Sequence, residues 1–195
     1  MARTNRRGIF ALLDVRERQA SGNWSVKPDV WLSPSPYFGP HPQTGYFGGG
    51  GTGDPAFSDV DRIDYSNDTA TASPKGPLSA AGRGGSGTGN SSYGWMHIGY
   101  IPIIYNRSIV NRIDYSNDTA TASVRGPLNT GSIDTAATGN ASYGYVGGGR
   151  APALTSRVDR IDYSNDTATA SPKGPLSLAR RSLAATSAAA NGLPQ

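Results

Sequence analysis

The side chains best suited to chemistry in this sequence are acidic and amide groups that recur at a fixed spacing. In their first occurrence they are Asp61, Asp64, Asn67 and Asp68, and the set returns twice, with Asn111 replacing the first aspartate in the second copy. Carboxylate and amide oxygens gathered in a loop are the ligands that Ca²⁺ prefers. The spacing departs from that of an EF-hand loop, and Asn and Asp also stabilise turns by bonding to nearby backbone. We therefore expect turns here, with no metal site and no cofactor.

Paired carboxylates also suit glycoside hydrolysis, in which one acid protonates the leaving group and the other acts as base or nucleophile. An enzyme, however, needs one asymmetric constellation in one pocket, whereas this set is copied three times. The two histidines, His41 and His97, lie outside the repeated segment. No Gly-x-x-x-x-Gly-Lys loop for binding phosphate occurs in the chain. We therefore expect no enzymatic activity, and keep a polysaccharide-cleaving enzyme as a second alternative.

Three nearly identical repeats carry these acidic side chains. The segment RIDYSNDTATAS begins at Arg62, Arg112 and Arg160 without a single change, so successive copies lie 50 and 48 residues apart. Gly-Pro-Leu follows each copy, at 76–78, 126–128 and 174–176. A period of this length with glycine clusters is typical of propeller blades. We place the three units at about 45–93, 94–143 and 144–192.

Each unit is predicted to contain four short strands, which makes the expected fold mainly β. In the first unit, three of them lie at 46–47, 60–65 and 69–73, with a turn at 66–68 between the second and the third. The fourth is the Ala-Ala-Thr stretch before Gly-Asn, clearest at 136–138 and 184–186. Alternate residues of a strand point to opposite faces, so the alanines of the third strand indicate that something packs closely there.

The first 44 residues differ from the repeats and form a separate N-terminal part. Ile9, Leu12 and Leu13 fall on one side of a predicted short helix, which needs a partner surface to be stable. Residues 27–43 contain five prolines and three aromatic side chains. We expect an extended arm lying on a neighbouring protein, because a plain spacer has little use for exposed aromatics. The residues expected to dock are Ile9, Leu12, Leu13, Trp24, Trp31, Tyr37 and Phe38.

The composition fits short strands and many turns. Of 195 residues, 26 are Gly and 14 are Pro, and only 36% are hydrophobic. The formal net charge of +4 is too small and dispersed to indicate nucleic-acid binding, and we expect none. The absence of cysteine excludes disulfides and thiolate metal sites.

The sequence predicts neither a membrane span nor a secretory signal. No stretch approaches the roughly 20 apolar residues that cross a bilayer. The apolar run after the basic start stops at Asp14, which is too short for the core of a signal peptide. We therefore expect synthesis and folding in a cytoplasm.

The order of motifs within a unit resembles a kelch-type blade. A glycine cluster after Tyr46 and Phe47, the Val-Asp-Arg-Ile-Asp-Tyr segment, and Gly-Pro-Leu follow one another as in that family, although the usual Trp after the second strand is missing. The whole repeat, over 45–187, is similar to kelch-like repeats in tail and fibre proteins of phages that infect cyanobacteria. The segment 8–24, which ends in Gly-Asn-Trp, resembles a short helix of many phage tail and particle proteins. The resemblance implies propeller-like blades in a virion protein.

These expectations favour a structural protein of the virion, namely a tail fibre or fibre-like component. Its N-terminus would dock onto other virion proteins, and its repeats would serve attachment to the host surface. The residues expected to stack on host glycans are aromatics of the middle unit, Trp95, Tyr100 and Tyr105. An adaptor or decoration protein of the head, neck or baseplate, without a receptor role, is the alternative. Three units are too few for a propeller of about 4–8 blades, so we expect a homo-oligomer.

Overall fold

The structure is a computed structural model that describes residues 44–187 apart from residues 54, 102–103 and 105. The chain divides into two units, Met1–Pro40 and His41–Gln195, and every described residue belongs to the second. The predicted N-terminal helix and its arm lie outside the described residues. So do all the residues expected to dock: Ile9, Leu12, Leu13, Trp24, Trp31, Tyr37 and Phe38.

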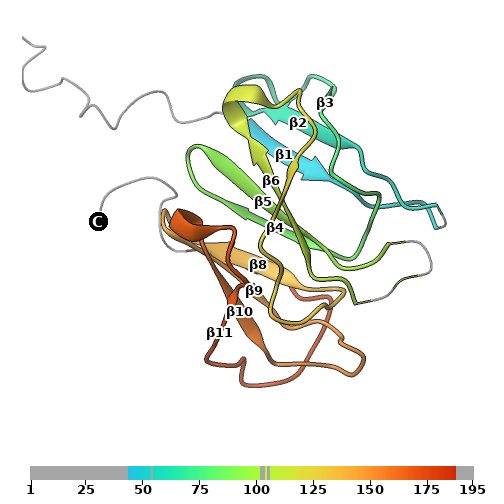
Figure 1. The fold of residues 1–195 in the computed structure, drawn as a ribbon. Helices are drawn as coiled ribbons and strands as arrows, with labels where there is room; N and C mark the ends of the chain where they lie inside the picture. Colours follow the sequence, from blue (N-terminus) through green and yellow to red (C-terminus); the bar gives the residue numbers. More distant parts are fainter. Residues whose placement is uncertain (1–43, 54, 102–103, 105, 188–195) are drawn as a thin grey trace, which may run out of the picture. The chain divides into compact units, whose positions relative to one another are not determined.

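The described part is mainly β, as predicted, and consists of three antiparallel sheets (Figure 1). The first sheet contains β1 (Thr44–Gly48), β2 (Val60–Asp64) and β3 (Ser73–Lys75). The second contains β4 (Ser86–Gly89), β5 (Tyr93–Ile98), β6 (Ile109–Asp114) and β7 (Ser123–Arg125). The third contains β8 (Ala136–Gly139), β9 (Tyr143–Gly147), β10 (Val158–Asp162) and β11 (Ser171–Lys173). In each sheet the strands are neighbours in chain order.

The sheets are out of phase with the sequence repeat. The Ala-Ala-Thr strand that ends the second repeat is β8, and it pairs with β9 of the third repeat, with Ala137 opposite Val146. In the same way β4 ends the first repeat and pairs with β5 of the second, with Thr88 opposite Trp95. Each sheet after the first therefore takes its first strand from the repeat before it. The first sheet is left with three strands, and the stretch predicted as a strand at 184–186 forms none.

The turn predicted after the second strand is one turn of 3-10 helix in each repeat: η1 (Tyr65–Asn67), η2 (Tyr115–Asn117) and η3 (Tyr163–Asn165). Asp64 caps the first of these, since its Oδ1 accepts from the Ser66 amide at 2.9 Å. These short turns are the only helical elements in the described residues, and none is long and apolar enough to span a membrane.

The third strand predicted at 69–73 is wrong, because residues 68–70 form a turn and bend, 71–72 are irregular, and β3 begins only at Ser73. The Ala70 amide donates to the Asn67 carbonyl at 3.2 Å, so the backbone bonds locally instead of in a ladder. The glycine cluster adopts backbone conformations that suit glycine. Gly49 and Gly50 have φ of 72° and 100°, a region that disfavours side chains, and their amides bond to the Asp59 and Gly82 carbonyls.

The hydrophobic core lies between successive repeats. One cluster joins Val60 and Leu78 of the first repeat to Ile113 and Ala122 of the second. The other cluster joins the equivalent residues one repeat later: Val110, Leu128, Ile161 and Ala170. A repeat thus buries its apolar face only against the next repeat, as in other repeat proteins.

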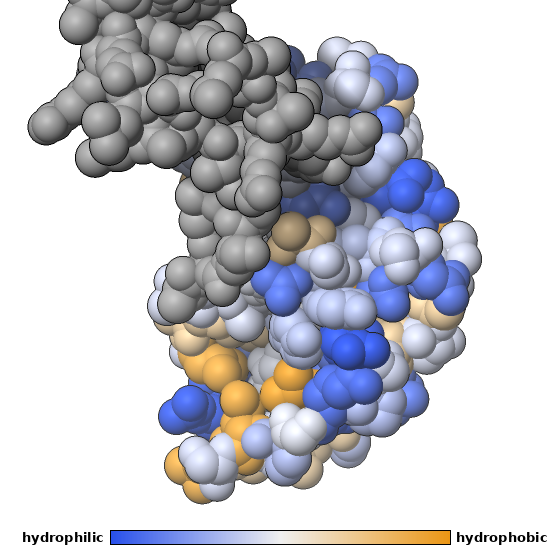
Figure 2. All heavy atoms as spheres, turned by 90° about the vertical axis from the view of Figure 1, so that its left-hand side faces the viewer, coloured by the Kyte–Doolittle hydropathy of each residue, from blue (hydrophilic) through white to orange (hydrophobic). Residues whose placement is uncertain are grey.

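Apolar side chains also gather on the surface, toward the lower end of the view in Figure 2, where the third sheet lies in Figure 1. The third repeat contributes two exposed leucines, Leu154 and Leu178, and the latter is 64% exposed. This end of the described part therefore exposes apolar surface.

Candidate functional site

The last aspartate of the repeated turn reaches back to the preceding repeat. In the second repeat this residue is Asp118, which is 9% exposed. Its Oδ2 accepts from Arg62 Nη1 at 2.7 Å and from the Tyr46 hydroxyl at 3.0 Å, and Lys75 Nζ lies 3.6 Å from its Oδ1. One carboxylate of the second repeat therefore accepts two hydrogen bonds from the first and forms an ion pair with Lys75. We call such a set, an aspartate with three donors of the repeat before it, an aspartate clasp.

The same aspartate clasp joins the second repeat to the third. Asp166 Oδ2 accepts from Arg112 Nη1 at 2.9 Å and from Trp95 Nε1 at 3.0 Å, and Arg125 Nε lies 3.5 Å away. Hydrogen bonds in which both groups are charged are stronger than neutral ones, and more so when partly buried. The recurrent acidic group thus acts as a joint between repeats.

A second recurrent acidic or amide group forms another joint. Asn111 Oδ1 accepts from the Ser79 amide at 3.0 Å, and one repeat later Asp159 Oδ2 accepts from the Asn129 amide at 3.1 Å. Both side chains are buried, and Arg157 Nε lies 3.2 Å from the Asp159 carboxylate. A buried carboxylate needs partners of this kind to offset its loss of hydration.

Aromatic side chains stack across the same interfaces. The rings of Tyr46 and Tyr115 lie 4.9 Å apart, and those of Trp95 and Tyr163 lie 3.9 Å apart, each pair within 8° of parallel. Burial raises the pKa of Tyr163 to about 12 and also raises the pKa of Tyr115. Both phenols therefore stay neutral in ordinary buffers, and the Tyr163 hydroxyl lies 2.8 Å from Thr88 Oγ1.

The aromatics expected to stack on glycans are placed differently from the prediction. Trp95 and Tyr100 are 1% and 5% exposed, so the expectation that they face solvent is wrong. The indole is enclosed because it stacks on Tyr163 and donates to Asp166, and the Arg83 guanidinium lies 4.5 Å over the Tyr100 ring. Tyr105 lies outside the described residues. An alignment of the repeats indicates that Trp95 is an interface residue, because it occupies the position that Tyr46 has in the first repeat.

His97 is buried between the second and third sheets. Its Nε2 lies 2.9 Å from the Arg107 carbonyl, and its Nδ1 lies 3.3 Å from Thr135 Oγ1. Burial lowers the pKa of this imidazole to about 4, so it is neutral at pH 7. No group of three or more His, Cys, Asp or Glu within the described residues is arranged to hold a metal ion.

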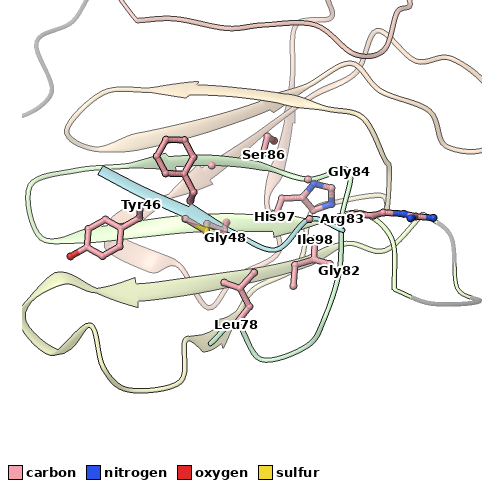
Figure 3. Close-up of a pocket in the computed structure, with 14 residues that line it drawn as sticks. Tyr46, Gly48, Leu78, Gly82, Arg83, Gly84, Ser86, His97 and Ile98 are labelled. Atoms are coloured by element: carbon pink, nitrogen blue, oxygen red, sulfur yellow. The ribbon is translucent and has the colours of Figure 1, made fainter. Parts of the chain in front are cut away.

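Two hollows lie along β1, and Figure 3 shows the first of them. It has a volume of about 300 Å³ and is lined by Tyr46, Gly48, Ser86 and His97 among others. The second, of about 510 Å³, continues along the same strand and is lined by residues that include Thr44, Thr88 and Tyr115. We call the two hollows together the β1 groove.

The β1 groove follows the free edge of an incomplete sheet. β1 is the edge strand of the first sheet, whereas the equivalent edges of β5 and β9 are covered by β4 and β8. The groove therefore occupies the place of a fourth strand.

Fold and site together define a β-repeat protein whose recurrent polar side chains join one repeat to the next. No protein-family model matches the chain, and no curated protein matches it.

Proposed function

We propose that the chain is a structural protein of a phage virion, most closely a tail fibre or fibre-like component. The observation that carries the structural role is the aspartate clasp, because the recurrent acidic side chains are used to hold repeats together. The resemblance of the repeated sequence to phage tail and fibre repeats supports the proposal that the protein is part of a virion. In this proposal residues 1–44 dock onto other virion proteins and the repeats serve host attachment.

The propeller-like form of the repeats belongs to the same proposal. The second and third sheets are meanders of four strands, and their first strands lie side by side, with Thr88 Oγ1 donating to the Thr138 carbonyl at 3.2 Å. Blades of four strands arranged around a channel are the plan of a propeller.

Immunogold electron microscopy tests the place in the particle. Antibodies raised against the purified chain are applied to particles of the phage that encodes it. We expect label on the tail fibres, since the repeats resemble fibre repeats. Label on the head, neck or baseplate would support the adaptor alternative. Particles whose proteins, identified by mass spectrometry, do not include the chain would overturn the proposal.

Competition for adsorption tests the attachment role. Purified protein, added to cyanobacterial host cells before the phage, is expected to bind the cells and to slow adsorption. Absence of both effects would leave an adaptor role and contradict attachment. Release of reducing sugars from host polysaccharide would overturn the structural reading in favour of an enzyme.

A further inference from the structure

We infer that the chain joins head to tail with a second copy of itself, and that residues 184–187 of one copy form the fourth strand of the first sheet of the next. The third repeat of the first copy then packs on the first repeat of the second copy. The inference stands on the contacts between repeats and does not depend on a place in a virion.

Among residues 44–187, where the structure describes them, one sheet lacks a strand and one strand-like segment lacks a sheet. Ala184, Ala185 and Thr186 repeat the Ala-Ala-Thr of β8 at an interval of 48 residues. Thr138 Oγ1 donates to the Thr186 carbonyl at 2.8 Å, as Thr88 Oγ1 donates to the Thr138 carbonyl at 3.2 Å. The final segment therefore already lies where the first strand of a fourth sheet would begin.

The chain's own sequence before β1 is a poor substitute for the missing strand. β4 and β8 each begin seven residues before the strand that they pair with, so the equivalent segment before β1 is 37–40. This segment reads Tyr-Phe-Gly-Pro and is flanked by Pro36 and Pro42. Proline has no amide hydrogen to donate to a ladder, and its presence argues against a strand.

The third repeat presents the donors of an aspartate clasp without the aspartate. Tyr145 and Arg160 lie opposite each other in β9 and β10, as Tyr46 and Arg62 do in the first sheet, and Lys173 completes the set. Within the described residues no carboxylate pairs with any of the three. Arg160 Nε is buried and has no hydrogen-bond partner there, a state that costs free energy.

The first repeat presents the aspartate without its donors. Asp68 is equivalent to Asp118 and Asp166, but it is exposed and has no ion pair among the described residues. Tyr65, whose equivalents stack on Tyr46 and Trp95, is 57% exposed. The two ends therefore complement each other in charge and in aromatic surface.

A glycine contact is also left unused at the end of the third repeat. A Cβ at Gly76 or Gly126 would collide with the carbonyl of Ala120 or Ala168 in the next repeat. The equivalent Gly174 has no atom within 4 Å of the position that its Cβ would take. Close approach of a second backbone explains a glycine at this position in all three repeats, and in our proposal a second copy supplies that backbone at Gly174.

The apolar residues follow the same pattern. Leu78 and Leu128 are buried under the isoleucine and alanine of the next repeat, whereas Leu176 is half-buried. Ile63 and Ala72 at the other end are also half-buried, and Figure 2 shows the apolar surface near the third sheet. Residues 62–73 are identical in sequence to 112–123 and 160–171, the segments that form the internal interfaces. The surface that docks inside the chain is therefore present on the first repeat, where no other described repeat covers it.

The pairing of β8 with β9 fixes the register between copies. Thr138 lies opposite Tyr145, so Thr186 is expected opposite Tyr46 of the second copy, and Ala185 opposite Phe47. Two copies that use both ends supply six sheets, a number within the range of about 4–8 blades in closed propellers.

Cysteine cross-linking tests this register in the full chain, which has no cysteine of its own. Chains with Ala185→Cys are mixed with chains with Phe47→Cys and oxidised. Residues directly opposite in antiparallel strands have Cβ atoms about 4.5–5.5 Å apart, close to the separation that a disulfide requires. We expect covalent heterodimers of the two variants. Val124→Cys, at an exposed position on β7, replaces Ala185→Cys in the matched control and is expected to give few.

A charge variant measures the strength of the joint. Asp68→Asn removes the carboxylate offered to Arg160 and Lys173 of the other copy, and we expect the dissociation constant from sedimentation to rise about tenfold or more. Asp118→Asn is the matched control, because it weakens a clasp within the chain and leaves the ends unchanged. A monomer at all concentrations without cross-linking would overturn the inference, and so would as many heterodimers with Val124→Cys as with Ala185→Cys. Cross-linked copies from a protein that does not occur in virions would leave it intact and refute only the proposed function.

Discussion

At the residue scale, Asp118 and Asp166 show how one side chain can serve three donors at once. Each carboxylate is buried, while the arginines that bond to it keep 34% and 23% of their side chains exposed. Partial exposure weakens each ion pair through solvent screening. The hydrogen bond from Trp95 is buried, whereas the one from Tyr46 is partly buried. The clasp thus combines partly screened charge pairs with buried or partly buried hydrogen bonds.

Asp166→Asn tests the clasp in the folded chain. An amide keeps the size of the side chain but removes the charge that Arg112 and Arg125 face. We therefore expect the free energy of unfolding to decrease by about 1–3 kcal/mol. Urea denaturation followed by tryptophan fluorescence measures this, because Trp95 touches the site. Asp59→Asn, at an exposed position, is the control, with an expected change within about 0.5 kcal/mol. Equal effects of the two substitutions would contradict the role of the clasp.

His97 predicts a pH dependence of stability. Its pKa falls from 6.5 to about 4 on folding because burial disfavours the imidazolium. The unfolded chain therefore binds more protons than the folded chain between these values, so stability decreases as the pH is lowered from 6.5 to 4. The slope contributed by this group is at most about 1.4 kcal/mol per pH unit.

His97→Gln is expected to remove most of this slope, which thermal unfolding at several pH values measures. Hydrogen bonds from the side chains of Ser66, Ser116 and Ser164 lower the pKa values of Asp64, Asp114 and Asp162. They add a further loss of stability when the pH falls below the ordinary aspartate range. The unmodified chain and the His97→Gln variant share this loss. An unchanged slope between pH 6.5 and 4 in the variant would refute the assignment.

At the element scale, the 3-10 turn and the loop after it make the contact between repeats. The glycine of Gly-Pro-Leu in the preceding repeat allows the two backbones to approach closely. Gly126→Ala would place a methyl group against the Ala168 carbonyl, so we expect a destabilisation of about 1–3 kcal/mol. Gly174→Ala is the matched control, since its position is open within one chain. The midpoint of urea denaturation in dilute protein separates the two. Equal destabilisation would mean that alanine disfavours the backbone conformation at both positions.

Elements that depend on local sequence signals were predicted correctly. Elements that depend on pairing between distant strands were missed. The second strand ends within one residue of its prediction, because an Asx turn follows it, in which the Asp64 side chain accepts from the Ser66 amide. The third strand was misplaced because the alternating Thr and Ala at 69–72 suggest a strand, whereas the equivalent segments of the second and third repeats, 119–122 and 167–170, pack against the repeat before them. The membership of β4 and β8 in the following sheets depends on pairing between repeats, which a strand pattern does not specify.

At the scale of the site, the sequence indicated turns for the acidic residues but not their partners. The prediction identified Asp64 and Asn67 as turn formers, and the structure confirms this. The clasps of Asp118 and Asp166 were missed, because their donors lie 41 to 72 residues away in the chain. Treating each repeat as the packing partner of the next would have suggested them, since all three sets of donors recur at fixed positions.

At the scale of the whole molecule, the two ends of the chain have different expected roles in assembly. The joint between copies uses the first sheet, the third repeat and residues 184–187, all within the unit His41–Gln195. Removal of Met1–Pro40 is therefore expected to leave the mass of the oligomer in solution unchanged apart from the lost residues. Removal of 184–195 takes away the donated strand and is expected to give monomers at micromolar concentration.

Light scattering coupled to gel filtration measures both truncated chains beside the full chain. Far-ultraviolet circular dichroism of each is the control for folding, because a β signal retained by a monomeric 184–195 deletion shows that only the joint is lost. If the oligomer dissociates when Met1–Pro40 is removed but persists when 184–195 is removed, assembly depends on the N-terminal unit and the strand donation is refuted. The opposite result would separate the two functions of the chain, since the N-terminal unit would then be free to bind a different protein.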